Sequence, residues 1–109
     1  MTLSEIKDRL SLECVCGDAD GREWNGVYAG DLLSRAMSHV KHDNMWITIM
    51  SNTNVIAVAS LTEAAAVILA EGVELLPEAL DAAKENGITV LSSTKTVYEL
   101  CSEIAQAVR

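Results

Sequence analysis

Apolar residues recur along the chain first at helical and then at strand spacing, and the pattern changes several times. At the start, Leu3, Ile6 and Leu10 mark one face of a helix. Thr2 and Glu5 stand three residues apart, which is the spacing of a capping box, in which each side chain bonds the other residue's backbone N–H. The first turn of the chain therefore predicts a short amphipathic helix.

Two short strands and a second helix are predicted next. Alternating residues over 12–16 indicate a strand that ends at Gly17, followed by a polar turn over 18–21. Residues 26–30 enclose Val27, Tyr28 and Ala29 between two glycines that let the backbone bend, which predicts a second short strand. A helix then begins at Asp31 or Ser34, and its predicted buried stripe is Leu33, Ala36, Met37 and Val40.

The middle of the chain holds one open alternative. Residues 45–50, MWITIM, are rich in strand formers and have few polar side chains, so we expect a strand buried on both faces. The segment after it, residues 51–63, is compatible with a hairpin partner or with a capped, buried helix. Residues 65–70, AAVILA, form the next predicted strand, which Glu71 and Gly72 close.

The last third predicts helix, strand and helix in that order. Pro77 suits a helix start and Gly87 a helix end, with Leu76, Leu80 and Ala83 facing inward. Residues 88–91 form a strand, 92–94 a polar loop and 96–108 a helix whose predicted inner face is Val97, Leu100, Cys101, Ile104 and Val108. Strands that alternate with helices indicate a parallel sheet with right-handed crossovers. We therefore expect one α/β domain over residues 1–109, three-layer-like, with a mostly parallel sheet and flanking helices.

Charge and composition exclude several classes of function. The formal net charge is −8, and no run of Lys or Arg could neutralise successive phosphates, so we expect no nucleic-acid binding. The uncharged stretch over residues 45–62 contains Ser, Thr and Asn residues at several positions and does not predict a membrane span. The N-terminus is charged and amphipathic where a signal peptide would be apolar. We expect a cytoplasmic protein without a membrane contact.

Neither the cysteines nor the histidines predict a metal site. Cys14, Cys16 and Cys101 are an odd number of thiols, which favours reduced side chains over a disulfide framework. Cys14 and Cys16 have strand spacing and are expected on one face, as small buried residues rather than as half of a metal or cluster site. His39 and His42 lie three apart on a helix beside an Asp, which is one ligand short of a closed site.

Polar residues follow each of the core strands. In open α/β sheets, ligands gather at the carboxyl ends of strands, beside helix N-termini. The candidate ligand-binding residues at these positions are Asn52, Asn54, Glu71, Gly72, Ser92, Ser93 and Thr94. The alternative is that the Ser, Thr and Asn residues only cap the helices that follow.

Four residues near the second strand are candidates for an interface or a structural motif. Asp31 is either a functional carboxylate or a helix-start residue that interacts with the helix dipole, and Ser34 shares its motif. Trp24 and Tyr28 either stack on a ligand base or occupy the core or a dimer interface. No spacing in the chain indicates a nucleophile, a base and an orienting group, so we predict no catalytic residues.

The order of GREWNGVYAGDLLSRAM, MWITIMSNTNVIAVASL, AAVILAEG and PEALDAAKENGITVLSS resembles a stand-alone DRTGG domain. The likeness runs from about Ile6 to Ile104 and is strongest in the pattern of elements and over residues 31–34. It favours the helix over the hairpin for residues 51–63. The Asp-Arg-Thr-Gly-Gly motif that names the family is not intact, since Arg22 is followed by Glu23, Trp24 and Asn25.

The resemblance implies an α/β module that is also inserted in some CBS-domain pyrophosphatases and phosphotransacetylases, with a regulatory or dimerising role. Some stand-alone members sit beside hydrogenase or NADH-dehydrogenase-like genes, and some are labelled as relatives of the HPr serine kinase. No GxxxxGK[ST] loop occurs in this chain, so we expect no kinase activity.

These inferences combine into one expected function and one alternative. We expect a small regulatory or interaction module without catalytic activity, which forms a homodimer and senses a nucleotide-like ligand or assists a hydrogenase- or NADH-linked redox partner. No metal or other cofactor is expected beyond such a nucleotide. The alternative is an enzyme that acts on a phosphorylated or acyl metabolite at the carboxyl ends of the strands, with Glu71 as its titratable group.

Overall fold

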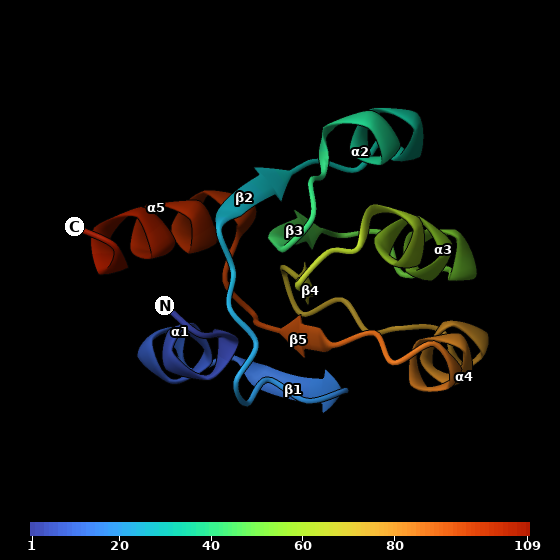
Figure 1. Ribbon diagram of the computed structural model, residues 1–109, viewed down its shortest axis with the longest axis horizontal. Coiled ribbons are helices and arrows are strands. Elements are labelled where there is room, and N and C mark those ends of the chain that lie inside the picture. The colour runs from blue at the N-terminus through green and yellow to red at the C-terminus, as the bar shows by residue number, and fades with distance from the viewer.

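The strands come together as one five-stranded sheet in the computed structural model, which describes residues 1–109 (Figure 1). Their order across the sheet is β1-β5-β4-β3-β2. Strands β2 to β5 are parallel, while β1 pairs antiparallel with β5. The prediction of a mostly parallel sheet is confirmed. The strands are β1 (Glu13–Cys16), β2 (Gly26–Ala29), β3 (Asn44–Thr48), β4 (Ala66–Leu69) and β5 (Val90–Ser92).

Five helices cover both faces of this sheet. Figure 1 shows α1 and α5 on one face and α2, α3 and α4 on the other, which gives three layers. The segment after β3 is the helix α3, so the hairpin alternative for residues 51–63 is wrong. None of the five helices is both long enough and apolar enough to cross a membrane. The helices are α1 (Leu3–Leu10), α2 (Leu33–His39), α3 (Thr53–Thr62), α4 (Pro77–Glu85) and α5 (Val97–Ala107).

Two apolar clusters fill the spaces between the layers. Met45 and Ile47 of β3 pack under α1 and α5, while Trp46 between them packs toward α2 and α3. Because side chains alternate along a strand, the apolar run of residues 45–47 within β3 supplies both clusters. Trp46 is fully buried, and its Nε1 donates to the Gly30 carbonyl at 2.9 Å. The predicted buried strand is confirmed for residues 45–48, whereas Ile49 is exposed and lies beyond the end of β3.

The start of α1 and both ends of α4 follow the sequence signals. The predicted capping box of α1 is present, because the Thr2 hydroxyl accepts from the Glu5 amide and Glu5 accepts from the Thr2 amide. Pro77 occupies the first turn of α4, and Gly87 follows that helix with a φ of 65°. A positive φ suits glycine because it has no Cβ to clash.

Several predicted inward positions lie at the surface instead. Met37 is exposed because α2 has only seven residues and buries only Ala36, while Leu76 and Val108 lie at the ends of their helices. Cys14 is exposed although Cys16 is buried, so the prediction that they share one face is wrong. The register of β1 against β5 shifts between these two residues, and such an irregularity breaks the two-residue alternation.

Candidate functional site

The loops that follow β4 and β5 are joined at the carboxyl edge of the sheet. The Glu71 amide donates to the Lys95 carbonyl at 2.8 Å, and the Gly72 amide donates to the Ser93 carbonyl at 2.9 Å. Glu71 and Gly72 have φ angles of 60° and 73°, so the chain turns back sharply after β4. These bonds hold the two loops in a fixed relative position.

A polar cleft of about 400 Å³ opens beside the joined loops. We call it the strand-end cleft. Four of the predicted ligand-binding residues line it together, namely Gly72, Ser92, Ser93 and Thr94. The polar residues that complete its wall were not predicted from the sequence; they are Ser11, Glu13, Glu74 and Lys95. The wall therefore combines four hydroxyl groups, one ammonium group and two carboxylates.

Lys95 is the only positively charged residue of the strand-end cleft. Its Nζ donates to the Leu10 carbonyl at 3.2 Å and to Glu103 Oε1 at 2.7 Å. An ammonium group has three donor hydrogens, so one remains for a ligand oxygen. The Lys95 amide donates to Ser93 Oγ at 3.0 Å, which fixes the turn before α5.

The helix α5 begins directly after Lys95 and is capped by its own side chains. Thr96 and Glu99 form a capping box, in which each side chain accepts the other's backbone N–H. These bonds to Thr96 lower the pKa of the Glu99 carboxyl from its ordinary value. Two N–H groups at this helix start are therefore already paired and do not face a ligand.

Three of the predicted ligand-binding residues lie outside the strand-end cleft. Asn52 caps α3, and its side chain accepts from the Asn54 amide at 3.1 Å. Asn54 is exposed in the first turn of that helix. Glu71 is exposed and does not line the cleft. The seven predicted residues therefore do not form one site. The four that come together lie beside the carboxyl ends of β4 and β5.

Asp31 does not act as a helix-start residue, which was one of the two interpretations of its place in the sequence. The N-cap of α2 is Leu32, which makes no side-chain capping bond. Asp31 Oδ1 instead accepts from Thr48 Oγ1 at 2.8 Å and from the Ile49 amide at 3.0 Å. Its carboxylate thus links the end of β2 to the end of β3, while Ser34 lies exposed in α2.

Replacing Asp31 with alanine should lower the free energy of unfolding by about 1–2 kcal/mol, since the fully buried Thr48 hydroxyl would lose its acceptor. Asp31→Asn keeps an oxygen at this position and should cost less than half as much. Urea denaturation of both variants measures the difference. Equal losses for the two variants would contradict the hydrogen-bonding role.

Trp24 and Tyr28 are half-buried on opposite faces of the sheet. Trp24 packs against the cluster under α1 and α5, and its Nε1 is buried without a hydrogen-bond partner. Tyr28 packs against the other cluster, with its ring 6.0 Å from that of His39. Both side chains pack against the core and stay partly exposed to solvent. This position agrees with the core role expected from the sequence and leaves part of each ring free for an interface.

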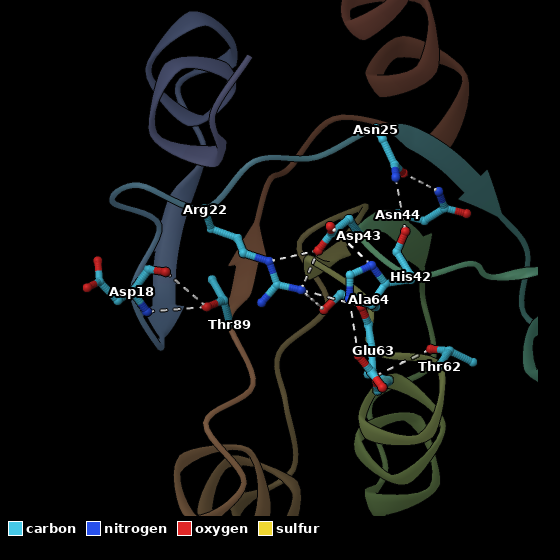
Figure 2. A network of polar contacts seen from close by, with 11 residues as sticks. Asp18, Arg22, Asn25, His42, Asp43, Asn44, Thr62, Glu63, Ala64 and Thr89 are labelled. Carbon is cyan, nitrogen blue, oxygen red and sulfur yellow. Dashed lines mark hydrogen bonds and ion pairs between the residues drawn. The ribbon is translucent and has the colours of Figure 1, made fainter.

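A second polar network lies at the amino ends of β3 and β4, opposite their carboxyl ends (Figure 2). Arg22 reaches from the loop after β1, and its Nε and one terminal nitrogen donate to Asp43 Oδ1 at 3.1 and 2.8 Å. The same terminal nitrogen approaches the carbonyl oxygens of Glu63 and Ala64 at 3.4 and 3.5 Å. Arg22 thereby joins the chain segments that lead into β3 and β4.

His42 extends the Arg22 network, whereas His39 lies elsewhere. The His42 ring nitrogens lie 3.2 Å from Asp43 Oδ2 and 3.1 Å from Glu63 Oε2. His39 Nδ1 lies 2.9 Å from the Arg35 carbonyl oxygen. The two histidines therefore do not converge on one point, and no group of three or more His, Cys, Asp or Glu side chains could hold a metal ion.

Burial also shapes the chemistry of two thiols. Loss of solvent raises the pKa of Cys16 and of Cys101, so both remain protonated at neutral pH. Cys16 Sγ lies 3.5 Å from the Ile88 carbonyl oxygen and can donate to it. Neither thiol has the character of a reactive nucleophile.

Three comparisons with known proteins bear on these observations. The model of the DRTGG domain family matches residues 5–107. A solved structure of the CBS and DRTGG domains from the regulatory region of Clostridium perfringens pyrophosphatase, complexed with the activator diadenosine tetraphosphate, has a TM-score of 0.80 and 19% sequence identity. The match covers 97% of this chain and 46% of that one, so the present chain spans about half of it. At this identity the likeness shows a shared fold. A search of curated protein sequences found no significant match.

Proposed function

Because the chain belongs to the DRTGG domain family, we propose that it is a small regulatory module that senses a nucleotide-like ligand at the strand-end cleft. The observation that carries the proposal is the grouping of four hydroxyls and the Lys95 ammonium around one cleft at the carboxyl end of β5. Ligands of open α/β sheets bind at this edge. The pyrophosphatase regulatory region, which shares the fold, is complexed with a dinucleotide activator.

The chemistry of the cleft suits the two polar parts of a nucleotide. Hydroxyl groups and the remaining Lys95 hydrogen donate to phosphate oxygens. The carboxylates of Glu13 and Glu74 accept hydrogen bonds, so they suit ribose hydroxyls or a cation that accompanies the phosphates. A phosphate without such a cation would be repelled by these two carboxylates. We therefore expect stronger binding when Mg²⁺ is present.

A ligand in this cleft would touch segments that are distant in sequence. Ser11 and Glu13 flank the start of β1, Gly72 and Glu74 follow β4, and Thr94 follows β5. A ligand that bridges them would stabilise their relative positions and raise the stability of the whole domain. Through such a change in stability, a small module signals to a partner protein that the ligand is bound.

The enzyme alternative named one titratable group at the carboxyl ends of the strands. Glu71 was the candidate, and it does not line the cleft. The polar residues of the wall instead form a binding surface in which the one lysine is already paired with Glu103. We therefore place the proposal on ligand sensing rather than on catalysis or on assistance to a redox complex.

Thermal unfolding with adenine nucleotides, dinucleoside polyphosphates and nicotinamide dinucleotides, each with and without Mg²⁺, tests the proposal. A ligand at about one hundred times its dissociation constant adds roughly 2.7 kcal/mol, which raises the midpoint by about ten degrees in a domain of this size. We expect such a rise for at least one of these nucleotides.

Two variants test whether a rise in the unfolding midpoint comes from binding at the strand-end cleft. Thr94→Ala removes a hydroxyl from the cleft wall and should reduce the ligand-dependent shift, while leaving the unliganded midpoint within about one degree of that of the wild type. Thr53→Ala is the matched control, because Thr53 is an exposed hydroxyl residue at the start of α3, outside the cleft. No shift with any nucleotide, or equal shifts in both variants, would overturn the proposed site.

A further inference from the structure

The carboxylate of Glu103, on α5, is bonded to the only cation of the strand-end cleft from outside the cleft wall. Its Oε1 lies 2.7 Å from Lys95 Nζ, which is the shortest ion pair of the structure. Glu99, one turn earlier on α5, instead accepts from the Thr96 amide. An ammonium group contacts a phosphate oxygen as closely as it contacts a carboxylate oxygen, at about 2.7–2.9 Å. Glu103 therefore competes with an anionic ligand for Lys95.

The ion pair between Lys95 and Glu103 is exposed enough to open. The two side chains are 32% and 38% exposed, and an ion pair in contact with water gains little because solvent screens both charges. A phosphate carries more negative charge than a carboxylate and offers three acceptor oxygens, so it is the stronger partner. The bond from Lys95 Nζ to the Leu10 carbonyl, at the end of α1, keeps the ammonium group in place when Glu103 leaves it.

A hollow between α1 and α5 offers Glu103 a second position. Figure 1 shows these two helices on the same face of the sheet. The hollow has a volume of about 220 Å³, and its wall consists of Arg9, Leu10, Glu103, Gln106 and Ala107. Lys95 lines the strand-end cleft while Glu103 lines the hollow, so their ion pair lies between the two spaces. Arg9 is exposed and forms no ion pair of its own.

On the basis of the proposed function, we propose that Glu103 makes the strand-end cleft selective for ligands that carry a phosphate. In the unliganded protein the Glu103 carboxylate pairs with Lys95. A bound phosphate replaces it on Lys95, and the carboxylate rotates into the hollow and pairs with Arg9. Glu103 thus has a cationic partner in both states, and only a ligand with its own negative charge drives the exchange.

This exchange has two consequences for the module. A nucleoside without a phosphate lacks the group that displaces Glu103, so the cleft distinguishes it from the corresponding nucleotide. Binding also changes which residue of α5 pairs with α1, because Glu103 moves from a lysine that bonds the end of α1 to an arginine on α1 itself. The contact between these two helices therefore differs between the unliganded and the liganded protein.

Titration calorimetry with inorganic tripolyphosphate and Mg²⁺ tests the exchange without a nucleotide. Glu103→Gln keeps the shape of the side chain and removes its charge, so it should lower the dissociation constant about fivefold. Glu85→Gln is the matched control, because it changes the net charge equally at an exposed position of α4 that forms no ion pair, and it should leave the dissociation constant unchanged. Circular dichroism confirms that both variants are folded.

A double-mutant cycle tests the role of Arg9. Arg9→Met should raise the dissociation constant of tripolyphosphate about threefold, because Glu103 then has no cation to turn to and stays on Lys95. In the Glu103→Gln background, the same substitution should have no more effect than Arg35→Met, which removes a positive charge at an exposed position of α2. Only a carboxylate that moves between the two cations gives this dependence of one substitution on the other.

The outcomes separate this inference from the proposed function. No binding of tripolyphosphate, or equal dissociation constants for the wild type and Glu103→Gln, would overturn the exchange. A loss that Arg9→Met causes equally in the Glu103→Gln background would place Arg9 on the ligand and overturn the movement of Glu103. If tripolyphosphate follows the expected pattern while no nucleotide raises the unfolding midpoint, the exchange stands and the proposed function fails. A nucleotide that binds the wild type and Glu103→Gln equally would have the opposite meaning.

Discussion

Replacing Gly17 with alanine is expected to cost about 4 kcal/mol or to prevent folding, because both the backbone angle and the available space exclude a side chain. Gly17 has a φ of 85°. An added Cβ would lie 2.5 Å from Thr89 Cα and 2.6 Å from Thr89 Oγ1. Thr89 is buried and its hydroxyl bonds both the amide and the carbonyl of Asp18, so it has no room to move.

Gly21→Ala provides the matched control for this prediction. Gly21 has a similar φ of 75°, but no heavy atom lies within 4 Å of an added Cβ. Its substitution carries only the conformational strain, which is about 1–2 kcal/mol. Urea denaturation of both variants separates strain from collision. Similar losses for the two would show that the contact between Gly17 and Thr89 relaxes and does not fix β1 against β5.

The local patterns of the sequence predicted the elements because each element carries its own signal. The capping box at Thr2 and the proline at the start of α4 act within one turn of chain, so a single sequence discloses them. The buried strands β3 and β4 were predicted for the same reason, since their apolar runs need no partner to be recognised. The family resemblance settled only the ambiguous helix α3.

The errors arose where distant segments meet. The antiparallel pairing of β1 with β5 joins residues more than seventy positions apart, and its register shift exposes Cys14. The same pairing brings Ser11 and Glu13 to the strand-end cleft, which no local pattern could indicate. Lys95, in contrast, directly follows Thr94 and could have been included. The role of Asp31 stayed open between two interpretations because a bond to Thr48 of a neighbouring strand leaves no mark in the local sequence.

Arg22 shows how a residue near the altered family motif can be explained by the fold alone. Arg22 corresponds to the arginine of the Asp-Arg-Thr-Gly-Gly motif, whereas Glu23, Trp24 and Asn25 after it depart from that motif. Its guanidinium group lies at the amino edge of the sheet, opposite the strand-end cleft, and it contacts side-chain and backbone oxygens but no residue of the cleft wall (Figure 2). This arrangement indicates that Arg22 stabilises the turns before β3 and β4.

Replacing Arg22 with methionine should therefore lower the free energy of unfolding by about 1–2 kcal/mol, since the partly exposed Asp43 carboxylate would lose two charge-assisted hydrogen bonds. Arg22→Lys should recover less than half of this loss, because a single ammonium group cannot reproduce the planar fork that reaches both Asp43 and the Ala64 carbonyl. Chemical denaturation of the two variants measures both losses.

Arg35→Met is the matched control, because Arg35 is an exposed residue of α2 whose side chain forms no ion pair, and it should change stability by less than about 0.5 kcal/mol. In a double-mutant cycle, Arg22→Met and Asp43→Asn should together cost less than the sum of their separate effects, since both remove the same contact. A stable Arg22→Met protein that no longer shifts its unfolding midpoint with nucleotide would contradict this assignment. It would move the ligand from the carboxyl edge of the sheet to the amino edge, beside Arg22 and His42.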